Sequence, residues 1–383
     1  RYSLIEASTK AGKAQPLDAL VYTPTGPRRM GDIQPGDWVL TPAGRSRVRE
    51  VYPQEGPREI LKVTFSDGAV VEADSDHLWE VHEFPRGRAP RIFTTEQLQT
   101  WPEARRRRAW VTKIASADYD RQPVPLDPYL VGALIGDGGL SGETVKFANA
   151  DPEMVCWVTA LLPAGHQMVH EGRHDWRITA RRGAAALRET GSHLRGMLAQ
   201  LGLVGTWSDT KFIPDCYRYN TAAVRVAMLQ GLLDTDGFVD KHGQPGIEQT
   251  SQRLAADIEE VVQSLGGTVL TRLRAVNGYR DKAGRFLQCK PVYRQVIRMP
   301  DGGMLFRLDR KRALCRRKRK TGHRMFRSIE FSRRAAAKCI ELDDDRQLYL
   351  TNGLVPTHNT AGCICWIVEQ ALAGNDGWNY WWV

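Results

Sequence analysis

The strongest constraint on the fold is a segment that occurs twice. Leu130–Gly138 (LVGALIGDG) and Leu229–Gly237 (LQGLLDTDG) share one pattern, and their aspartates Asp137 and Asp236 lie 99 residues apart. Small residues recur four positions apart in each segment, which places them on one face of a helix where a second helix can approach closely. The duplication therefore predicts two helices packed side by side, each ending in Asp-Gly.

Such packing brings the carboxylates of Asp137 and Asp236 to one place. Two like charges are costly together unless a cation lies between them, and Mg²⁺ favours oxygen ligands of this kind. Carboxylates that hold metal ions at a phosphate are parts of metal-assisted phosphodiester hydrolysis. Asp127 and Pro128 supply an N-cap and a first helical residue for the first helix. Either helix alone is also compatible with an ordinary core helix, an interpretation that the duplication disfavours.

The paired segments resemble the LAGLIDADG motifs of homing endonucleases. The resemblance implies an α/β endonuclease of two pseudo-repeats that needs Mg²⁺, held by Asp137 and Asp236, and takes double-stranded DNA as its substrate. Lys211, in the segment Lys211–Pro214, resembles a lysine that these nucleases use to activate water or stabilise charge on the phosphate. A surface lysine remains the alternative interpretation.

Basic and aromatic segments follow the two helices. They fit a β-saddle laid along a DNA groove, with arginine and lysine on phosphates and base edges. A formal net charge of +10 agrees with a polyanionic partner. Two arginine-rich runs extend this contact or serve as linkers. The saddle segments are Lys146–Phe147, Arg173–Arg182, Thr271–Arg274 and Tyr293–Arg298, and the runs are Arg105–Arg108 and Arg316–Lys320.

The sequence on either side of this region is different in character. Turn residues break Leu17–Val111 into short β-branched runs, and similar runs return at Gln347–Val355, whereas 128–326 mixes helical patterns with basic strands. Insertions are tolerated at exposed loop tips. The pattern therefore predicts a β-domain whose chain is interrupted by an α/β domain.

The two ends of the chain form halves of one motif. Ala7–Lys13 (ASTKAGK) is a phosphate-binding loop that lacks its hydroxyl residue, and Thr360 followed by the helical pattern of Ala361–Ala373 supplies it. Joined, the ends give a Walker A loop in which Gly12, Lys13 and Thr360 bind Mg-ATP. The joined flanks, 37 residues in all, resemble the ATPase domain of a phage terminase large subunit.

The block Ala14–Asn359 between these halves resembles inteins. An asparagine amide such as that of Asn359 can attack its own backbone carbonyl and break the bond to Thr360. His358 is placed to protonate the departing amine, and the Thr360 hydroxyl can accept an acyl group. The resemblance implies autocatalytic splicing without a cofactor, by a β-rich, horseshoe-like (Hint) domain.

Near the other junction, Val71–Trp79 resembles the intein motif that carries a TxxH histidine. His77 would protonate the amide nitrogen after Lys13. Asp74 stands where most inteins have threonine, which puts the help of that hydroxyl in doubt.

Ala14 departs from most inteins, which start with cysteine or serine. One explanation is a class 1 intein inactivated by a Cys-to-Ala change. The favoured one is the class 3 inteins, whose Trp-Cys-Thr set matches Trp79, Cys339 and Thr357. In that case Cys339 attacks the carbonyl of Lys13, while Trp79 and Thr357 position the reacting groups.

These observations give five segments and a set of expectations for the whole. Seven cysteines without paired spacing argue against a disulfide framework or a zinc site. The absence of a long apolar run and of a signal-peptide pattern predicts a cytoplasmic protein, in a bacterial or phage-infected host cell, that does not span a membrane. We also expect the precursor to be monomeric. The implied DNA target is the intein-less host gene. A P-loop ATPase with a non-splicing DNA-binding insertion, or with a dead nuclease, is the rival interpretation. The segments are an N-extein at 1–13, splicing domain at 14–118, endonuclease at 119–326, splicing domain at 327–359 and C-extein at 360–383.

Overall fold

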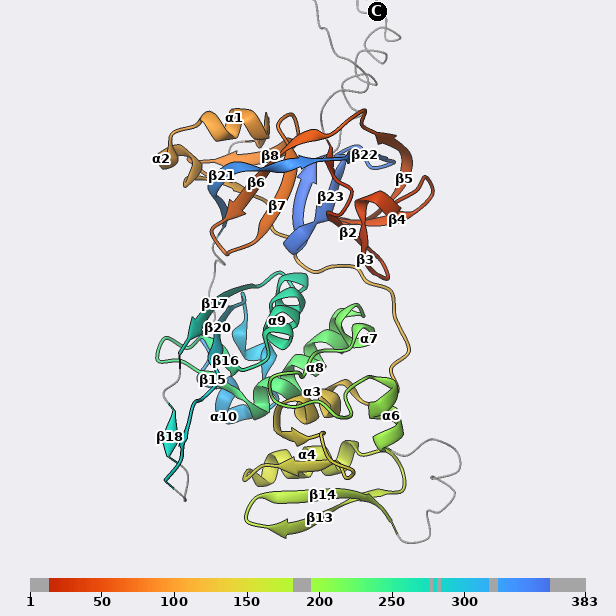
Figure 1. Ribbon diagram of the computed structural model, residues 1–383, viewed down its shortest axis with the longest axis vertical. Helices are drawn as coiled ribbons and strands as arrows, with labels where there is room; N and C mark the ends of the chain where they lie inside the picture. The colour runs from red at the N-terminus through yellow and green to blue at the C-terminus, as the bar shows by residue number, and fades with distance from the viewer. Residues whose placement is uncertain are drawn as a thin grey trace, which may run out of the picture. The chain divides into compact units, whose positions relative to one another are not determined.

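The computed structural model describes residues 14–87, 89–181, 194–275, 278–280, 284–316 and 323–358. The chain forms two compact units: residues up to 118 together with those from 322 onward, and residues 119–321 (Figure 1). The inserted unit was expected to end at 326. Strand β21 begins at Arg324 and pairs with strands of the first unit, so the first unit resumes at 322. In the part of the chain that the structure describes, no helix has the length and apolar character needed to cross a membrane.

The first unit consists mainly of short strands. Its elements are β1 (Gln15–Pro16), β2 (Leu20–Thr23), β3 (Gly26–Arg29), η1 (Met30–Asp32), β4 (Trp38–Thr41), β5 (Gly44–Pro53), β6 (Arg58–Phe65), β7 (Val70–Asp74), β8 (Leu78–Glu83), β9 (Arg91–Thr94), α1 (Thr95–Thr100), α2 (Glu103–Arg106), β10 (Ala109–Val111), β21 (Arg324–Ala335), β22 (Ala337–Leu342), β23 (Leu348–Thr351), η3 (Asn352–Leu354) and β24 (Val355–His358).

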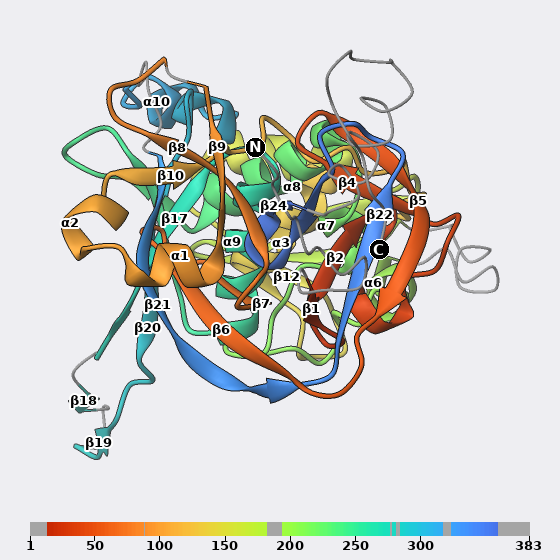
Figure 2. The ribbon, with the colours of Figure 1, turned by 90° about the horizontal axis from the view of Figure 1, so that it is seen from above.

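These strands form two antiparallel sheets to which both ends of the unit contribute. One sheet has the order β1-β22-β5-β4, and the other β3-β2-β23-β24-β8-β10-β21-β6-β7, with β9 beside β8. Figure 2 shows the long ribbon β21 running beside β6. Alternating apolar residues bury one face of these ribbons, as in β6, where Leu61, Val63 and Phe65 belong to one buried cluster. The expected β-rich domain, built from two separate stretches of sequence, is confirmed.

The second unit mixes helices and strands. Its elements are α3 (Pro128–Asp137), β11 (Gly138–Gly139), β12 (Lys146–Ala148), α4 (Pro152–Leu161), β13 (His166–Gly172), β14 (Asp175–Ala180), α6 (Leu194–Gln200), α7 (Asp215–Arg218), α8 (Ala222–Thr235), β15 (Gly237–Val239), β16 (Pro245–Gln249), α9 (Gln252–Ser264), β17 (Thr268–Arg274), β18 (Tyr279–Arg280), β19 (Phe286–Leu287), β20 (Val292–Arg298), η2 (Gly302–Leu305) and α10 (Asp309–Arg312).

The same arrangement occurs twice in this unit. After α3 come β11, β12, α4, β13 and β14, and after α8 come β15, β16, α9, β17 and β20. The sheets have corresponding orders, β11-β12-β14-β13 and β15-β16-β20-β17. The hairpin β18-β19 lies between the last two strands of the second repeat. The expected α/β unit of two pseudo-repeats is confirmed.

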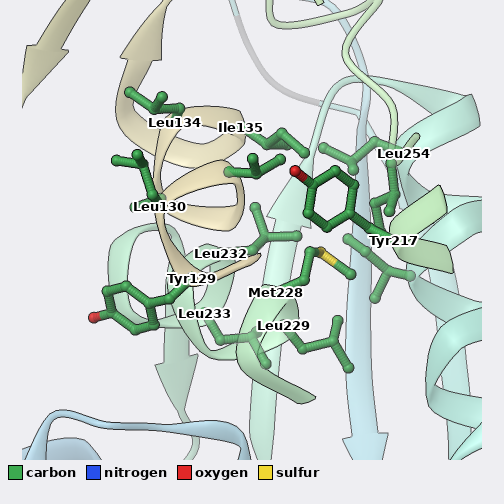
Figure 3. Close-up of a cluster of buried hydrophobic side chains, with 14 of the residues drawn as sticks. Tyr129, Leu130, Leu134, Ile135, Tyr217, Met228, Leu229, Leu232, Leu233 and Leu254 are labelled. Atoms are coloured by element: carbon green, nitrogen blue, oxygen red, sulfur yellow. The ribbon is translucent and has the colours of Figure 1, made fainter. Parts of the chain in front are cut away.

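The core of the second unit is centred on α3 and α8 (Figure 3). Asp127 accepts hydrogen bonds from the backbone N–H groups of Tyr129 and Leu130, and Pro128 follows it, as the sequence predicts. Apolar side chains surround both helices, among them Leu134, Met228 and Leu232, which are fully buried. Helix α3 buries every residue from Tyr129 to Ile135, the pattern of a central rather than a surface helix.

Candidate functional site

The upstream end of the block lies in the core of the first unit. β1 pairs antiparallel with β22, and Gln15 faces Lys338. Continuing this register by one residue places Ala14 opposite Cys339. Ala14 is fully buried beside Ile60, and its carbonyl accepts a hydrogen bond of 3.0 Å from the backbone N–H of Asp74. The amide before Ala14 therefore lies between β22 and β7, next to the cysteine.

Tyr349, a buried residue of β23, lies within electrostatic reach of both Cys339 and Asp74. Burial raises the pKa of Tyr349, and the negative charges of Cys339 and Asp74 raise it further. The Tyr349 hydroxyl donates a hydrogen bond of 2.9 Å to Oε1 of Gln15. Cys339 is 8% exposed, so its thiol is shielded from solvent. Cys339 therefore lies on the strand that pairs with β1, in the buried part of the first unit.

His77, Trp79 and Thr357 form one fully buried cluster. Nε2 of His77 is hydrogen-bonded to the hydroxyl of Thr357. The Trp79 ring packs edge-on against the His77 ring at 5.3 Å between centroids. Its indole N–H donates to Oγ1 of Thr95 at 3.0 Å, and the backbone N–H of Thr95 donates to the His77 carbonyl. Trp79 and Thr357 therefore fix the position of His77.

The downstream end of the block is bound to the same cluster. His358 closes β24, where it faces Leu348 on β23 and Leu78 on β8, the residue after His77. Three hydrogen bonds link the upstream and downstream ends of the block. The backbone N–H of Asp74 donates to the Ala14 carbonyl, and the N–H of His77 donates to the Asp74 carbonyl at 3.2 Å. The His77 ring is in turn hydrogen-bonded to Thr357. The predicted residues Gly12, Lys13, Asn359 and Thr360 lie outside the described residues.

The second site depends on close contact between α3 and α8. A Cβ atom added to Gly132 would lie 2.0 Å from the Met228 carbonyl oxygen, and one added to Gly231 would lie 2.0 Å from the Tyr129 carbonyl oxygen. Backbone therefore packs directly on backbone, which only glycine permits. The small residues of the two motifs meet as the sequence predicts.

This contact brings Asp137 and Asp236 together at the ends of the helices. A Cβ on Gly136 would lie 3.6 Å from Cγ of Asp236. Burial, and then the charge of Asp236, raise the pKa of Asp137 to about 6. Repulsion between the carboxylates is the electrostatic signature of a cation site, and oxygen ligands suit Mg²⁺. The described residues include no group of three or more His, Cys, Asp or Glu side chains arranged to hold a metal. These two aspartates therefore fit an ion that takes its remaining ligands from water or a phosphate.

An amide side chain accompanies each aspartate. Nδ2 of Asn149 donates to Oδ2 of Asp137 at 2.5 Å, and Nε2 of Gln249 donates to Oδ2 of Asp236 at 3.1 Å. The two amides are 100 residues apart, almost the offset of the aspartates. They hold the carboxylates in place, and the sequence interpretation missed them.

Lys211 is buried, so the alternative of a surface lysine is wrong. Its ammonium donates to the carbonyls of Gly136 and Gly138 at 2.8 and 2.9 Å. Burial lowers its pKa, while the charges of Asp236 and Asp137 act in the opposite direction. The lysine thus caps the end of α3 and lies within electrostatic reach of both carboxylates.

Lys311 plays the matching part at α8, and the sequence interpretation missed it. Its ammonium donates to the carbonyls of Leu233, Asp234 and Gly237 at 2.9, 2.7 and 2.7 Å. It lies 100 residues after Lys211. A search for basic residues at the offset of the two helices would have found it.

The predicted basic saddle is partly neutralised by glutamates. Arg274 and Arg294 both pair with Glu248, at 2.8 and 2.5 Å. Lys146 and Arg177 both pair with Glu171, at 3.0 and 2.8 Å. Strand β14 begins at Asp175, and Arg173 lies in the preceding turn with φ of +49°, so the strand expected from Arg173 starts two residues later. The basic side chains lie on the expected sheets, with acidic partners.

The run Arg105–Arg108 is not a linker. Its first half belongs to helix α2, and Arg105 pairs with Glu83 at 2.9 Å while its guanidinium lies 3.5 Å from the centre of the Trp101 ring. The run therefore packs on the first unit. Of the second run, only Arg316 lies within the described residues.

Comparisons with known proteins find similarity to one family model and to two DnaB helicases. The family model of a LAGLIDADG-like domain matches residues 223–285. The chain is 27% identical over 386 residues to the replicative DNA helicase DnaB of Mycobacterium intracellulare, covering 93% of this chain and 60% of that protein. The DnaB helicase of Mycobacterium leprae is 37% identical over 78 residues, 20% of this chain and 13% of that protein. The chain thus spans less than two thirds of the length of either relative.

Solved structures of two kinds are similar to this chain. The MchDnaB-1 intein is 14% identical with a TM-score of 0.28, covering 91% of this chain and all of that one. A variant of the homing endonuclease I-DmoI is 16% identical with a TM-score of 0.28, covering 47% of this chain and 92% of that one. TM-scores this low support no functional conclusion. The strand orders, the duplicated repeat and the family match together identify the fold as a β-rich, Hint-like unit interrupted by a LAGLIDADG-like α/β unit.

Proposed function

We propose that this chain is a self-splicing intein that excises residues 14–359, joins Lys13 to Thr360 and carries a homing endonuclease. The observation that carries the splicing proposal is the register of β1 on β22, which sets Ala14 beside Cys339. An alanine cannot attack the preceding carbonyl, whereas a buried thiol on the neighbouring strand can.

The proposed reaction needs no cofactor. The Cys339 sulfur attacks the carbonyl carbon of Lys13, the bond to the Ala14 nitrogen breaks, and the amine leaves with a proton. The acyl group then passes from the thioester to the Thr360 hydroxyl. Asn359 cyclises with help from His358 and releases the block, and the remaining ester rearranges to an amide. His77, held by Trp79 and Thr357, is the proton donor that the intein resemblance implies.

The test is intact-mass spectrometry of freshly expressed protein. Splicing yields a ligated peptide of 37 residues and a freed block of 346 residues. An unchanged mass that becomes spliced product in Ala14→Cys would instead favour the second candidate, a class 1 intein inactivated at position 14. Conversion that persists in Cys339→Ala would refute the class 3 chemistry.

The second proposed activity is cleavage of double-stranded DNA at the intein-less host gene. The contact between α3 and α8 supports it, because it places Asp137 and Asp236 side by side. These carboxylates would hold Mg²⁺, which supplies charge stabilisation at the scissile phosphate. Lys211 would act on water or on the phosphate charge.

A suitable DNA substrate is a plasmid in which the codons of residues 1–13 are fused directly to those of 360–383. Wild-type protein with Mg²⁺ should linearise it, whereas Asp137→Asn and Asp236→Asn should not, and both variants should splice normally. Cleavage at the wild-type rate by either variant would exclude this metal site. Binding without cleavage by the wild type would favour the rival, a DNA-binding insertion with a dead nuclease.

The host protein is also a proposal. The flanks restore a Walker A loop for Mg-ATP, and both curated relatives are DnaB helicases rather than terminases. We therefore propose a P-loop ATPase as host and leave the terminase resemblance with the 37 flanking residues that suggested it. A monomeric, cytoplasmic precursor fits this host. An ATPase with a non-splicing insertion is the rival, and it predicts nucleotide binding by the unspliced chain.

A further inference from the structure

Asp74 is a buried carboxyl group with no evident structural purpose. It ends β7, is fully buried, and occupies the position where the intein resemblance expects threonine. Neither of its side-chain oxygens forms a hydrogen bond of standard geometry with the described residues. The nearest ion-pair partner is Arg58, whose Nε lies 3.5 Å from Oδ2. An unsatisfied buried carboxyl group costs free energy, so its presence calls for a chemical role.

Asp74 lies beside Ala14, whose nitrogen is the leaving amine of the proposed reaction. The backbone N–H of Asp74 holds the Ala14 carbonyl at 3.0 Å. Burial raises the pKa of Asp74 to about 6, although the N–H of Ala14, the charge of Arg58 and the N–H of His77 each act to lower it. The N–H of Ala14, the leaving amine of the proposed reaction, therefore acts on a carboxyl group whose pKa lies near neutral pH. A threonine hydroxyl at this position would not titrate there.

By the register of β1, Cys339 lies opposite Ala14 on β22, whereas His77 is hydrogen-bonded to Thr357. The charges of Cys339 and Asp74 both act on Tyr349, whose hydroxyl binds Gln15 next to the junction. His77 bonds through Nε2 to Thr357, on the strand that ends at the downstream junction. The other charged group near Asp74 is Asp76, which pairs with Arg58 at 3.1 Å.

We infer that Asp74, rather than His77, carries the proton from the Cys339 thiol to the Ala14 nitrogen in the first acyl transfer. This inference rests on the proposed splicing function. The thiol gives its proton to the carboxylate as the sulfur bonds to the Lys13 carbonyl carbon. The carbon–nitrogen bond then breaks, the Ala14 nitrogen takes the proton from the carboxylic acid, and the carboxylate is regenerated. The products are a thioester and a free amine, and no other reactant is needed.

The pH dependence follows from this proton count. The reactive form holds one proton between Asp74 and Cys339. Below a pH of about 6 both groups are protonated, so the rate should rise through this pH and then level off. Without the carboxylate only the thiolate reacts, and the rate should climb further, toward the titration of an ordinary thiol at about 8.5.

The experiment isolates the upstream step in Asn359→Ala, which cannot cyclise. The rate of cleavage between Lys13 and Ala14 is measured from about pH 5 to about pH 9, spanning both titrations, with dithiothreitol at concentrations where the rate no longer depends on it. Asp74→Asn should lower the rate at neutral pH by about 100-fold, the usual contribution of a general acid or base, and should lose the rise near pH 6. Circular dichroism of this nearly isosteric variant checks the fold.

Asp76→Asn is the matched control, since it removes a neighbouring carboxylate that shares Arg58 but is 48% exposed. It should keep the rise and move it to lower pH, because the charge of Asp76 raises the pKa of Asp74. The inference would be overturned if Asp74→Asn kept the wild-type cleavage rate and pH dependence. It would also be overturned if the rise in rate near pH 6 were lost in His77→Gln but kept in Asp74→Asn. Cleavage that persists at full rate in Cys339→Ala would instead overturn the splicing proposal itself.

Discussion

Replacing Gly132 by alanine should separate the two central helices of the inserted unit. Two effects oppose each other. Alanine stabilises a helix interior by about 1 kcal/mol relative to glycine. The added Cβ, however, would lie 2.0 Å from the Met228 carbonyl oxygen and 2.8 Å from the Leu232 nitrogen. Both atoms belong to the backbone of α8, so no side chain can turn away to relieve the contact.

The clash should outweigh the gain in helix propensity. Ordinary contact begins at 3.4 Å, so α8 must move by about 1.4 Å from a position 2.0 Å away. Overpacking of a dense core costs about 1–3 kcal/mol and more where backbone must shift. Separation of the helices also loosens the fully buried Leu229 and Leu232. A net loss of about 1–2 kcal/mol follows, which lowers the melting temperature of a unit this size by about 2–8 °C.

Calorimetry measures this loss, because a change confined to residues 119–321 should shift one transition and leave that of the splicing unit in place. Gly231→Ala should behave alike, since its Cβ meets the Tyr129 carbonyl at 2.0 Å. Gly139→Ala is the control, because its Cβ makes only an ordinary contact of 3.4 Å with Lys146. An equal or higher melting temperature for Gly132→Ala would refute the close packing and the convergence of the two aspartates.

Three further outcomes are expected. Cys339→Ala should abolish cleavage after Lys13 and leave cleavage after Asn359, as mass spectrometry of the fragments would report; an intact ligated product would contradict it. Lys311→Met should destabilise the inserted unit by about 2 kcal/mol or more, because three backbone carbonyls lose their hydrogen-bond donor. It should also slow DNA cleavage. An unchanged midpoint of denaturant unfolding would show that water replaces the ammonium group at no cost. The third outcome concerns pH in the absence of divalent cations. The pKa of Asp137 is raised from 3.8 to about 6 in the folded state, so the folded state holds this proton more tightly than the unfolded state. The free energy of unfolding should therefore fall as the pH rises from about 4 to about 6. Denaturation of Asp137→Asn should not show this pH-dependent loss of stability. In the wild type at neutral pH, added Mg²⁺ should restore the lost stability. A stability that does not change with Mg²⁺ would contradict the cation site.

What the sequence predicted well depended on short-range patterns and on duplication. The start of α3 follows from a cap and a proline in adjacent positions, and these interactions form within one helical turn. The convergence of Asp137 and Asp236 followed from the repeat, because two similar helices with small faces have few ways to pack. The interrupted β-unit followed from a change in hydrophobic pattern on either side of 119–321.

What the sequence did not predict depends on contacts between distant residues. Lys311 caps α8 only after the chain has returned through a whole sheet, and nothing in its neighbourhood resembles a motif. Arg105 belongs to a run that suggests a solvated linker, yet Glu83 and Trp101 fix it on the first unit. Asp74 was recognised as a departure from threonine, but its burial against Ala14 required the structure. Apart from the spacing of Lys311 from Lys211, which follows the repeat, the single sequence contains no direct signal for these pairings.

The late position of β22 has a consequence for protein synthesis. The inserted unit, 119–321, is continuous in sequence and can fold as it emerges, whereas β1 has no partner until Cys339 is translated. Between Val111 at the end of β10 and Cys339 lie more than 220 residues. At about 5–20 residues per second the ribosome needs roughly 11–46 s to add them. In the proposed reaction, the first bond exchange cannot begin before Cys339 has been translated, and a chain that terminates earlier lacks this nucleophile.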